Sequence, residues 1–330
     1  MGIPAIDISP FLAGDPVGKR RVADAVAATC RESGFLVISG HGLPAEDLDR
    51  AFGLTRDFMD LPQERKDRWH PSGPAKQRGY HAFATRGLAY TLDQEIPPDL
   101  RETLFLGPVD DHQAVYAGQP DALAAYWPNT IPTEPDGLDA ALVAIYRGFE
   151  RLAADMLRIF AVALDMPEDH FADKIDRHFS ILSCHHYPAL QEPPLPGQLR
   201  TGEHTDFGAM TLLAMTEAAG GLEARLPEGA WVPVQARPGE LAVNLGDMMA
   251  RWTNDRWTST LHRVVNPPNL EDAMSRRQSI GYFMHPNYDT LIECIPTCLD
   301  AGEAPIYPTI TAGEHIAMKI EKSHGVAPAA

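Results

Sequence analysis

Hydrophobic residues in the N-terminal part of the chain follow helical periods around one short strand-like run. The periods predict an amphipathic helix over residues 19–33 that ends at Gly34, and a second helix over residues 45–59. The apolar run at residues 35–38 lies between them and is typical of a buried strand. Residues 70–135 are rich in Pro, Gly and isolated aromatics, so we expect loops there, and such loops often carry binding residues.

The longest helical period follows Asp136, which we expect to cap the helix at its N-terminus. Its apolar residues step alternately by four and three, and they are Leu138, Leu142, Ile145, Phe149, Leu152, Met156, Ile159 and Ala163. Such a stripe is typical of a helix face that packs on the core. We therefore expect this helix to have a structural role and no part in the chemistry.

From His178 onward the pattern changes to short β-type runs separated by Gly and Pro. Many short strands with turn signals between them favour a sandwich or a barrel. The predicted strands are Phe179–Tyr187, Met210–Met215, Leu222–Leu226, Trp231–Val234, Leu241–Leu245, Thr260–Val265 and Ser279–Phe283.

Length and composition limit the class of protein. The 330 residues can form one large domain or two smaller ones, and 44% hydrophobic residues are typical of a globular protein. No apolar run approaches the roughly 20 residues of a membrane helix, and the N-terminus lacks a signal-peptide pattern, which favours a cytoplasmic protein without membrane contact. A net charge of −17 argues against binding to nucleic acid. The sequence gives no signal for the oligomeric state.

The four cysteines are too scattered for a disulfide scaffold, so we expect them to be reduced and structural. Cys294 and Cys298 have the spacing of half a zinc site. The sequence offers no second half, and a zinc site is therefore not predicted.

Two histidines and one aspartate form the pattern with the clearest chemistry. His204 and Asp206 flank Thr205, and His262 lies in a later β-type run. Alternate residues of a strand point to the same side, so His204 and Asp206 can share one metal ion. Two imidazoles and one carboxylate are the protein ligands of mononuclear non-haem Fe(II) sites, which keep further coordination positions open.

An arginine and a serine at alternate positions indicate an anion site. Arg277 and Ser279 begin the last predicted strand and share one of its faces. A guanidinium and a hydroxyl on one strand face can bind one carboxylate. The adjacent Arg276 points to the other face, so Arg277 is the candidate.

Other polar residues near these motifs have structural interpretations. His185 and His186 are adjacent on a strand, so they face opposite sides and cannot easily share one ion. Glu203 is expected to face away from the metal, and Asp247 is expected to cap the short helix that follows it. Arg263 is expected to form a structural ion pair.

The order and spacing of the motifs carry a family resemblance that covers nearly the whole chain. The N-terminal motifs are Ile3-Pro4-Ala5-Ile6-Asp7, Gly34-Phe35-Leu36-Val37-Ile38, His41-Gly42, Leu61-Pro62, Arg78-Gly79-Tyr80 and Glu102. The C-terminal motifs are His204-Thr205-Asp206-Phe207-Gly208, Asn244-Leu245-Gly246-Asp247, Ser259-Thr260-Leu261-His262-Arg263-Val264 and Arg277-Gln278-Ser279. Together they resemble the 2-oxoglutarate/Fe(II)-dependent oxygenases of the isopenicillin N synthase-like superfamily.

The resemblance implies a mainly β fold with flanking helices. Its core would be a double-stranded β-helix, or jelly roll, buttressed by N-terminal helices and by the long helix. It implies one compact structural unit in which residues 1–115 form an N-terminal oxygenase region that closes over the barrel. Residues 116–176 would be a linker with the long helix, residues 177–290 the Fe(II)/2-oxoglutarate core, and residues 291–330 a C-terminal extension.

The resemblance further implies a 2-oxoglutarate-dependent Fe(II) dioxygenase that consumes O2. Fe(II) would be held by His204, Asp206 and His262, with no catalytic residue beyond these ligands. The far carboxylate of 2-oxoglutarate would bind Arg277 and Ser279. Oxidation of a C–H bond, most simply hydroxylation, would accompany release of succinate and CO2, with desaturation or ring closure as variants within the family.

Relatives carry an Asn-x-Tyr pattern on the strand before the metal motif, and its tyrosine helps to hold the co-substrate. Here Tyr187 stands at the tyrosine position, which makes it a candidate for co-substrate binding. His185 replaces the asparagine, and its role is open.

The prime substrate is expected to be a small organic molecule that the sequence does not identify. Arg78, Tyr80 and Arg86 lie in the irregular segment that the implied fold places near the mouth of the barrel, and Phe283 lies on a core strand. An arginine there would suit a carboxylate on the substrate. Ordinary surface or packing roles are equally open for these residues.

Two other interpretations remain open. An Fe(II)/O2 oxidase or cyclase of the same fold, which does not use 2-oxoglutarate, can keep Arg277 and Ser279 for the carboxylate of its own substrate. A non-catalytic binding module would be expected to lose a metal ligand, and all three candidates are present.

Overall fold

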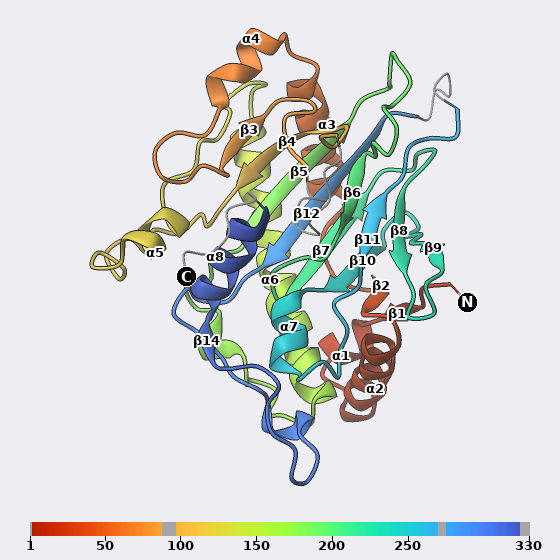
Figure 1. The fold of residues 1–330 in the computed structure, drawn as a ribbon, viewed down its shortest axis with the longest axis vertical. Helices are drawn as coiled ribbons and strands as arrows, with labels where there is room; N and C mark the ends of the chain where they lie inside the picture. Colours follow the sequence, from red (N-terminus) through yellow and green to blue (C-terminus); the bar gives the residue numbers. More distant parts are fainter. Residues whose placement is uncertain (1, 88–96, 270–274, 324–330) are drawn as a thin grey trace.

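A computed structural model describes residues 2–87, 97–269 and 275–323, and Figure 1 shows its smaller sheet against one face of a larger sheet. In order across the larger sheet, the strands are β1 (Ala5–Asp7), β2 (Phe35–Ser39), β10 (Leu241–Leu245), β7 (Met210–Met215), β12 (Arg277–Met284), β5 (Ile181–Tyr187), β4 (Glu102–Leu106) and β3 (Gly79–His81). The smaller sheet contains β6 (Thr201–His204), β11 (His262–Val264), β8 (Leu222–Arg225) and β9 (Trp231–Pro233). A separate pair is formed by β13 (Leu291–Ile292) and β14 (Ile310–Thr311).

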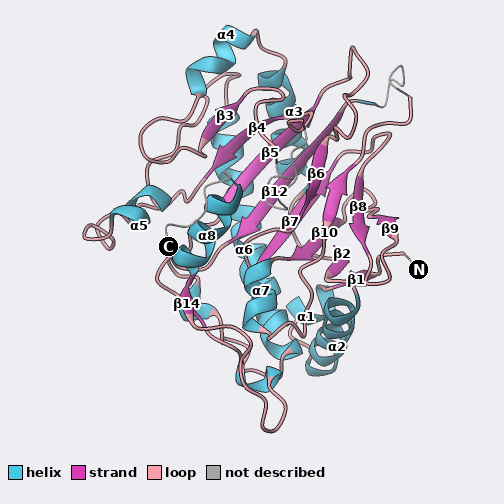
Figure 2. Ribbon diagram, viewed as in Figure 1, coloured by secondary structure: helices cyan, strands magenta, loops and turns pink. Residues whose placement is uncertain are grey.

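Helices cover the outer face of the larger sheet, as the view by secondary structure in Figure 2 shows. This layer contains α2 (Pro16–Glu32), α3 (Ala45–Met59) and α6 (Leu138–Ala163). The apolar stripe predicted along α6 is buried over its whole length, which confirms that prediction. Each buried Leu, Ile or Phe side chain stabilises the fold by about 1.5–3 kcal/mol. The other helices are α1 (Ser9–Leu12), α4 (Gln63–Lys66), α5 (Pro120–Ala125), α7 (Asp247–Trp252) and α8 (Ala312–Ser323), with 3-10 turns η1 (Asp67–Trp69), η3 (Ala172–Lys174) and η5 (Pro296–Cys298).

The inner face of the larger sheet packs against the smaller sheet. This second core consists of Phe35, Val37, Tyr187, Leu222, Ala224, Val234, Ala242 and Val264. Strand β10 pairs with the N-terminal strand β2, and β12 pairs with both β5 and β7. Strands from the two halves of the chain therefore share one sheet. The result is the expected mainly β fold with flanking helices.

The structure differs from the predicted elements at helix ends and in the loop-rich region. The predicted caps are wrong, because α6 begins after Gly137 at a φ of 82° and α7 begins after Gly246, each without a side-chain cap. The region over residues 70–135 contains β3, β4 and α5, which are too short to produce a detectable period. In the described ranges, no helix is both long and apolar enough to span a membrane.

Gly34 ends α2 and brings the chain close to a distant loop. Its φ is 62°, and a Cβ there would lie 1.9 Å from the carbonyl oxygen of Thr258. Only glycine adopts this left-handed conformation without strain and also leaves room for the carbonyl.

We expect Gly34→Ala to lower the free energy of unfolding by roughly 2–5 kcal/mol, because backbone strain and a close contact act together. Gly14→Ala is the matched control, since Gly14 has a φ of 81° and nothing within 4 Å of its added Cβ. The control should lose only roughly 1–2 kcal/mol. Urea denaturation measures both values, and equal losses would contradict the close contact.

Candidate active site

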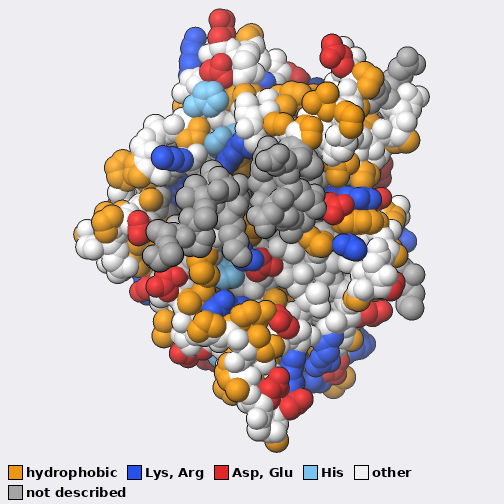
Figure 3. Space-filling view, viewed as in Figure 1, with side chains coloured by type: hydrophobic (Ala, Val, Ile, Leu, Met, Phe, Trp, Pro, Cys, Tyr) orange, Lys and Arg blue, Asp and Glu red, His pale blue; other side chains and the backbone are white. Residues whose placement is uncertain are grey.

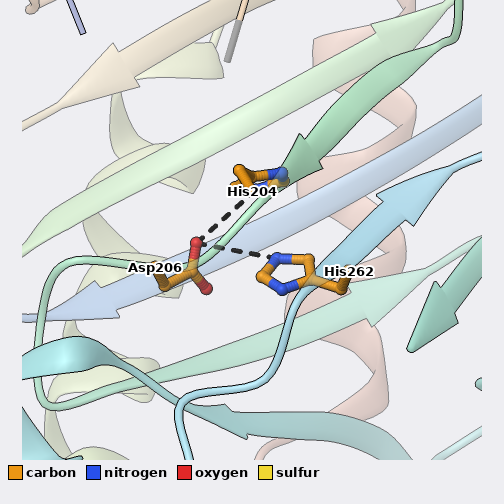
Figure 4. Close-up of side chains that lie close together, drawn as sticks. All are labelled: His204, Asp206 and His262. Atoms are coloured by element: carbon orange, nitrogen blue, oxygen red, sulfur yellow. Dashed lines mark ion pairs between the residues drawn. The ribbon is translucent and has the colours of Figure 1, made fainter. Parts of the chain in front are cut away.

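Three ligand-type side chains converge between the two sheets. Nε2 of His204 and Nε2 of His262 each lie 3.7 Å from Oδ1 of Asp206. Figure 4 shows the carboxylate of Asp206 directed toward both imidazole rings, whose centroids are 4.2 Å apart. All three side chains are buried. Among the described residues, these three form the cluster of His, Cys, Asp or Glu groups that is arranged to hold a metal ion.

The backbone fixes the tautomer of both histidines. Nδ1 of His204 lies 2.8 Å from the carbonyl oxygen of Gly202, and Nδ1 of His262 lies 3.0 Å from that of Thr260. A carbonyl oxygen only accepts, so each Nδ1 donates its proton and each Nε2 keeps a lone pair. Burial, and then the nearby His262, lower the pKa of His204 to about 3, so its ring is neutral at pH 7.

The carboxylate of Asp206 is oriented by two donors from the larger sheet. Its Oδ2 accepts hydrogen bonds from Nδ2 of Asn244, at 2.7 Å, and from the hydroxyl of Thr211. Burial acts to raise the pKa of Asp206, but the neighbouring imidazoles and these two donors outweigh it and lower the pKa. The carboxylate therefore stays ionised with Oδ1 facing the histidines.

The sequence predicts that His204 and Asp206 share one face of a single strand, but they do not. Strand β6 ends at His204, so Asp206 lies in the following loop. Residues His204 and His262 are paired on neighbouring strands, which places their rings side by side. The loop is held because the backbone N–H of Asp247 donates to the carbonyl oxygen of Asp206 at 2.8 Å.

The rival carboxylates have other partners. Nη1 of Arg263 donates to Glu203 at 3.0 Å, and its Nε donates to Glu223 at 2.9 Å. These contacts confirm the structural ion pair predicted for Arg263 and the outward direction of Glu203. Asp247 forms an ion pair with Lys319.

Arg277, Ser279 and Tyr187 are buried on the inner face of the larger sheet. Arg277 pairs with Tyr187 across β12 and β5, and its guanidinium carbon lies 5.0 Å from the centre of the Tyr187 ring. Burial lowers the pKa of Arg277. Among the described residues, its buried Nη1 has no hydrogen-bond partner. A buried guanidinium with a free donor is suited to an anion, because an unpaired buried charge is costly.

The neighbours of these residues face the opposite side of the sheet. Nε of Arg276 donates to Nε2 of His186 at 2.9 Å, and its other nitrogens donate to Asp60. His186 in turn donates from Nδ1 to Glu102 at 2.7 Å. His185 faces inward, so the prediction that the adjacent histidines face opposite sides is confirmed.

Arg78 and Tyr80 face away from the triad, contrary to the expectation that they lie at the mouth. Nη1 of Arg78 donates to the backbone oxygen of Trp127, and the hydroxyl of Tyr80 donates to Glu102. Burial is the main cause that lowers the pKa of Arg78 to about 10 and raises that of Tyr80. Tyr80 pairs with Leu104 on the outer face of the sheet.

Arg86 and Phe283 lie on the inner side. Phe283 shares the β12 face of Arg277 and Ser279, and Arg86 contacts His81.

Two residues that orient the carboxylate of Asp206 are not marked for this role by any pattern in the sequence. Thr211 and Asn244 are paired across β7 and β10, and this long-range register brings both to the carboxylate. No local pattern carries that register. Asn244 appeared only as part of a family motif.

Known proteins share both the sequence and the fold. Residues 178–286 match the 2OG-Fe(II) oxygenase superfamily, and residues 3–134 match the family described as non-haem dioxygenase in morphine synthesis N-terminal. The 2-oxoglutarate-Fe(II) type oxidoreductase hxnY of Emericella nidulans is 32% identical over 99% of this chain and 91% of its own length. The crystal structure of a full-length Neurospora crassa protein in complex with alpha-KG (2-oxoglutarate) has a TM-score of 0.84 and 31% identity, covering 96% of this chain and 95% of the other. The same protein with alpha-KG and thymine has a TM-score of 0.82, 29% identity and coverage of 98% and 97%.

The chain therefore belongs to the 2OG-Fe(II) oxygenase superfamily. It is a 2-oxoglutarate- and Fe(II)-dependent dioxygenase, an oxidoreductase that uses Fe(II), 2-oxoglutarate and O2. Its two facing sheets are the jelly-roll core of these enzymes.

We expect Asn244→Ala to weaken binding of a divalent metal by about tenfold to a hundredfold, because the carboxylate of Asp206 loses a donor that orients it. Asn129→Ala is the control, since the Asn129 amide also makes several hydrogen bonds but makes them with Gly107 and Pro108. Titration with Mn(II), which does not oxidise readily, measures both affinities. Unchanged affinity in Asn244→Ala would show that this hydrogen bond does not orient the ligand.

Proposed function

We propose that the enzyme hydroxylates a small organic molecule at an iron held by His204, Asp206 and His262. The donor set fits Fe(II), because two neutral imidazoles with free Nε2 lone pairs and one ionised carboxylate face a common centre. When bound, iron and 2-oxoglutarate supply the oxidising chemistry, in which O2 is consumed, succinate and CO2 are released, and oxygen is transferred to a C–H bond.

The buried Nη1 of Arg277 is the observation that carries the co-substrate assignment. The guanidinium is buried beside Ser279 and Tyr187, and Nη1 has no partner among the described residues. Arg277 and Ser279 would together bind the far carboxylate of 2-oxoglutarate, and the Tyr187 ring would keep the guanidinium in place. This binding would orient the other end of 2-oxoglutarate toward the triad.

The charge of the molecule makes such a specific anion site necessary. The net charge is −17, and the described side chains on the face in Figure 3 mix acidic, basic and apolar groups. A general positive field therefore does not attract an anionic co-substrate, and buried groups such as Arg277 have to hold it. The surrounding apolar core of the two sheets keeps water from the site.

A small prime substrate is supported by the neighbouring structures. The Neurospora crassa protein binds thymine together with alpha-KG, and its fold matches this chain over 98% of the length. The triad of His204, Asp206 and His262 lies buried between two sheets rather than on an open surface. A molecule of similar size would reach the triad from the edge of the sheets.

Replacing any member of the triad with Ala should remove bound Fe(II) and abolish succinate formation, because two remaining ligands cannot hold the metal. Glu203→Ala is the matched control, since Glu203 is adjacent to His204 but binds Arg263 on the other side. Metal content and succinate are measured, and circular dichroism checks the fold. Full metal content and activity in His262→Ala would contradict the assignment.

Arg277→Ala should raise the concentration of 2-oxoglutarate needed for half-maximal succinate formation by about a hundredfold, because a charge-assisted bidentate contact is lost. Arg276→Ala is the control, since it removes the same charge from the outer face and should change this concentration much less. Anaerobic addition of 2-oxoglutarate to the wild-type Fe(II) protein should produce a visible charge-transfer band. Absence of that band would favour an oxidase that does not use 2-oxoglutarate.

A further inference from the structure

A second group of polar side chains lies on the inner face of the larger sheet, next to the co-substrate residues. The pairing of β3, β4, β5 and β12 places His81, Thr103, His185 and Ser279 in one row across the sheet. Directly paired residues of antiparallel strands face the same side. These side chains therefore lie on the inner face that also carries Arg277, and the row extends this face from Ser279 to the edge strand β3.

Arg86 is the cation at the outer end of this row. Its Nη1 lies 3.4 Å from Nε2 of His81, and the same Nε2 lies 3.0 Å from the carbonyl oxygen of Gln77. The shorter contact requires Nε2 to donate its proton, so His81 offers no lone pair to Arg86 at that atom. Burial, followed by the charge of Arg101, lowers the pKa of Arg86. Among the described residues, Arg86 has no carboxylate partner.

Arg101 is close enough to both Arg86 and His204 for its charge to lower the pKa of each. Its Nη2 forms an ion pair with Asp99 at 3.1 Å, while its Nη1 lies 3.3 Å from Nδ1 of His185. Burial, Arg101, Arg277 and His204 all lower the pKa of His185, so its ring is neutral and lies close to these groups. Asp99 already offsets the charge of Arg101, whereas Arg86 has no carboxylate partner among the described residues.

Aromatic and small side chains share the inner face of the sheet with His81 and His185. The Phe105 ring contacts the rings of His81 and His185, with centroids 5.5 Å and 6.0 Å apart. In the same row as Phe105, β5 and β12 carry only Ser183 and Gly281. Phe283 follows on the same face of β12, and both phenylalanines are only partly buried. These residues suit contact with a flat or apolar molecule.

We propose that Arg86, with Phe105 and Phe283, binds the prime substrate and that this substrate is a small carboxylic acid with an aromatic or apolar body. The guanidinium of Arg86 binds the carboxylate, and the rings contact the body. The C–H bond to be oxidised then faces the triad. This assignment rests on the proposed function, because it places the acid beside the iron centre.

The charge of the site favours a carboxylate over a phosphate. The fork of one guanidinium matches the two oxygens and the single charge of a carboxylate. A phosphate dianion would need a second unpaired cation, and Arg101 is already paired with Asp99. His81 and His185 are neutral, because burial is the largest cause that lowers the pKa of each, to about 4 for His81.

Two pairs of molecules of nearly equal shape test the proposal: benzoate with benzamide, and phenylacetate with phenylacetamide. Each is titrated by calorimetry into anaerobic protein saturated with Fe(II) and 2-oxoglutarate, which occupy the triad and Arg277. In at least one pair, the acid should bind about tenfold or more tightly than the amide, because the charge-assisted contact is lost in the amide. The preference should disappear in Arg86→Gln and return in part in Arg86→Lys. Arg151→Gln, which removes an exposed arginine of α6, should keep it.

The titrations of the wild-type protein are sufficient to overturn the proposal. Either equal binding of acid and amide in both pairs or no binding of either acid would do so. A preference that survives in folded Arg86→Gln would overturn the role of Arg86. The proposed function is measured separately in wild-type protein, by the band that 2-oxoglutarate produces and by succinate formation. Absence of the band and of succinate would contradict the proposed function. Absence of a preference for the acid in the calorimetry, with band and succinate present, would contradict only the substrate proposal.

Discussion

The buried carboxylate of Asp206 is the contact on which the rest of the active site depends. A carboxylate between two sheets is strongly destabilising unless hydrogen bonds and partners compensate for the lost water. Thr211 and Asn244 hold Oδ2 from the larger sheet, while His204 and His262 approach Oδ1 from the smaller sheet. Polar contacts therefore join the two sheets at the metal-binding end, whereas apolar packing joins them elsewhere.

Two clusters of polar side chains lie on opposite faces of the larger sheet, and they differ in how many of their hydrogen-bonding atoms have partners. On its outer face, Glu102 accepts from Lys66 and from His186, both at 2.7 Å, and this network is closed. On its inner face, the buried Nη1 of Arg277 has no hydrogen-bond partner among the described residues, and Arg86 has no carboxylate partner among them. A closed buried network specifies strand register, whereas open buried donors are costly unless a ligand completes them. Arg277 differs from the polar residues around Glu102 because its buried Nη1 still lacks a hydrogen-bond partner among the described residues.

Local patterns predicted a sandwich or barrel, the stripe of α6 and the residues of the triad, because each depends on periodicity or on a short motif, whereas the jelly roll was implied by the family resemblance. They did not predict which way Arg78 and Tyr80 face. A strand of three residues has no period of its own, and its direction is set by pairing with β4. The same limit applies to Thr211 and Asn244, since their common role arises only when β7 and β10 pair. The sequence thus predicts the ligands better than the residues that orient them.

Arg200 places a second buried positive charge beside Tyr187 and Arg277. It is fully buried, donates to the carbonyl oxygens of Ala219 and Ser275, and lies over the Tyr187 ring at 5.8 Å. Burial, followed by the charge of Arg277, lowers the pKa of Arg200 to about 10, so the two guanidinium groups repel each other. Its Nη1 and Nη2 donate to neutral carbonyl groups, and its buried Nε has no hydrogen-bond partner among the described residues, so these contacts do not neutralise its charge. An anion on Arg277 relieves the repulsion of both groups, whereas a neutral ligand of the same shape relieves none of it. The two positive charges near Tyr187 therefore favour an anionic ligand over a neutral one, and the free Nη1 of Arg277 determines where the anion binds.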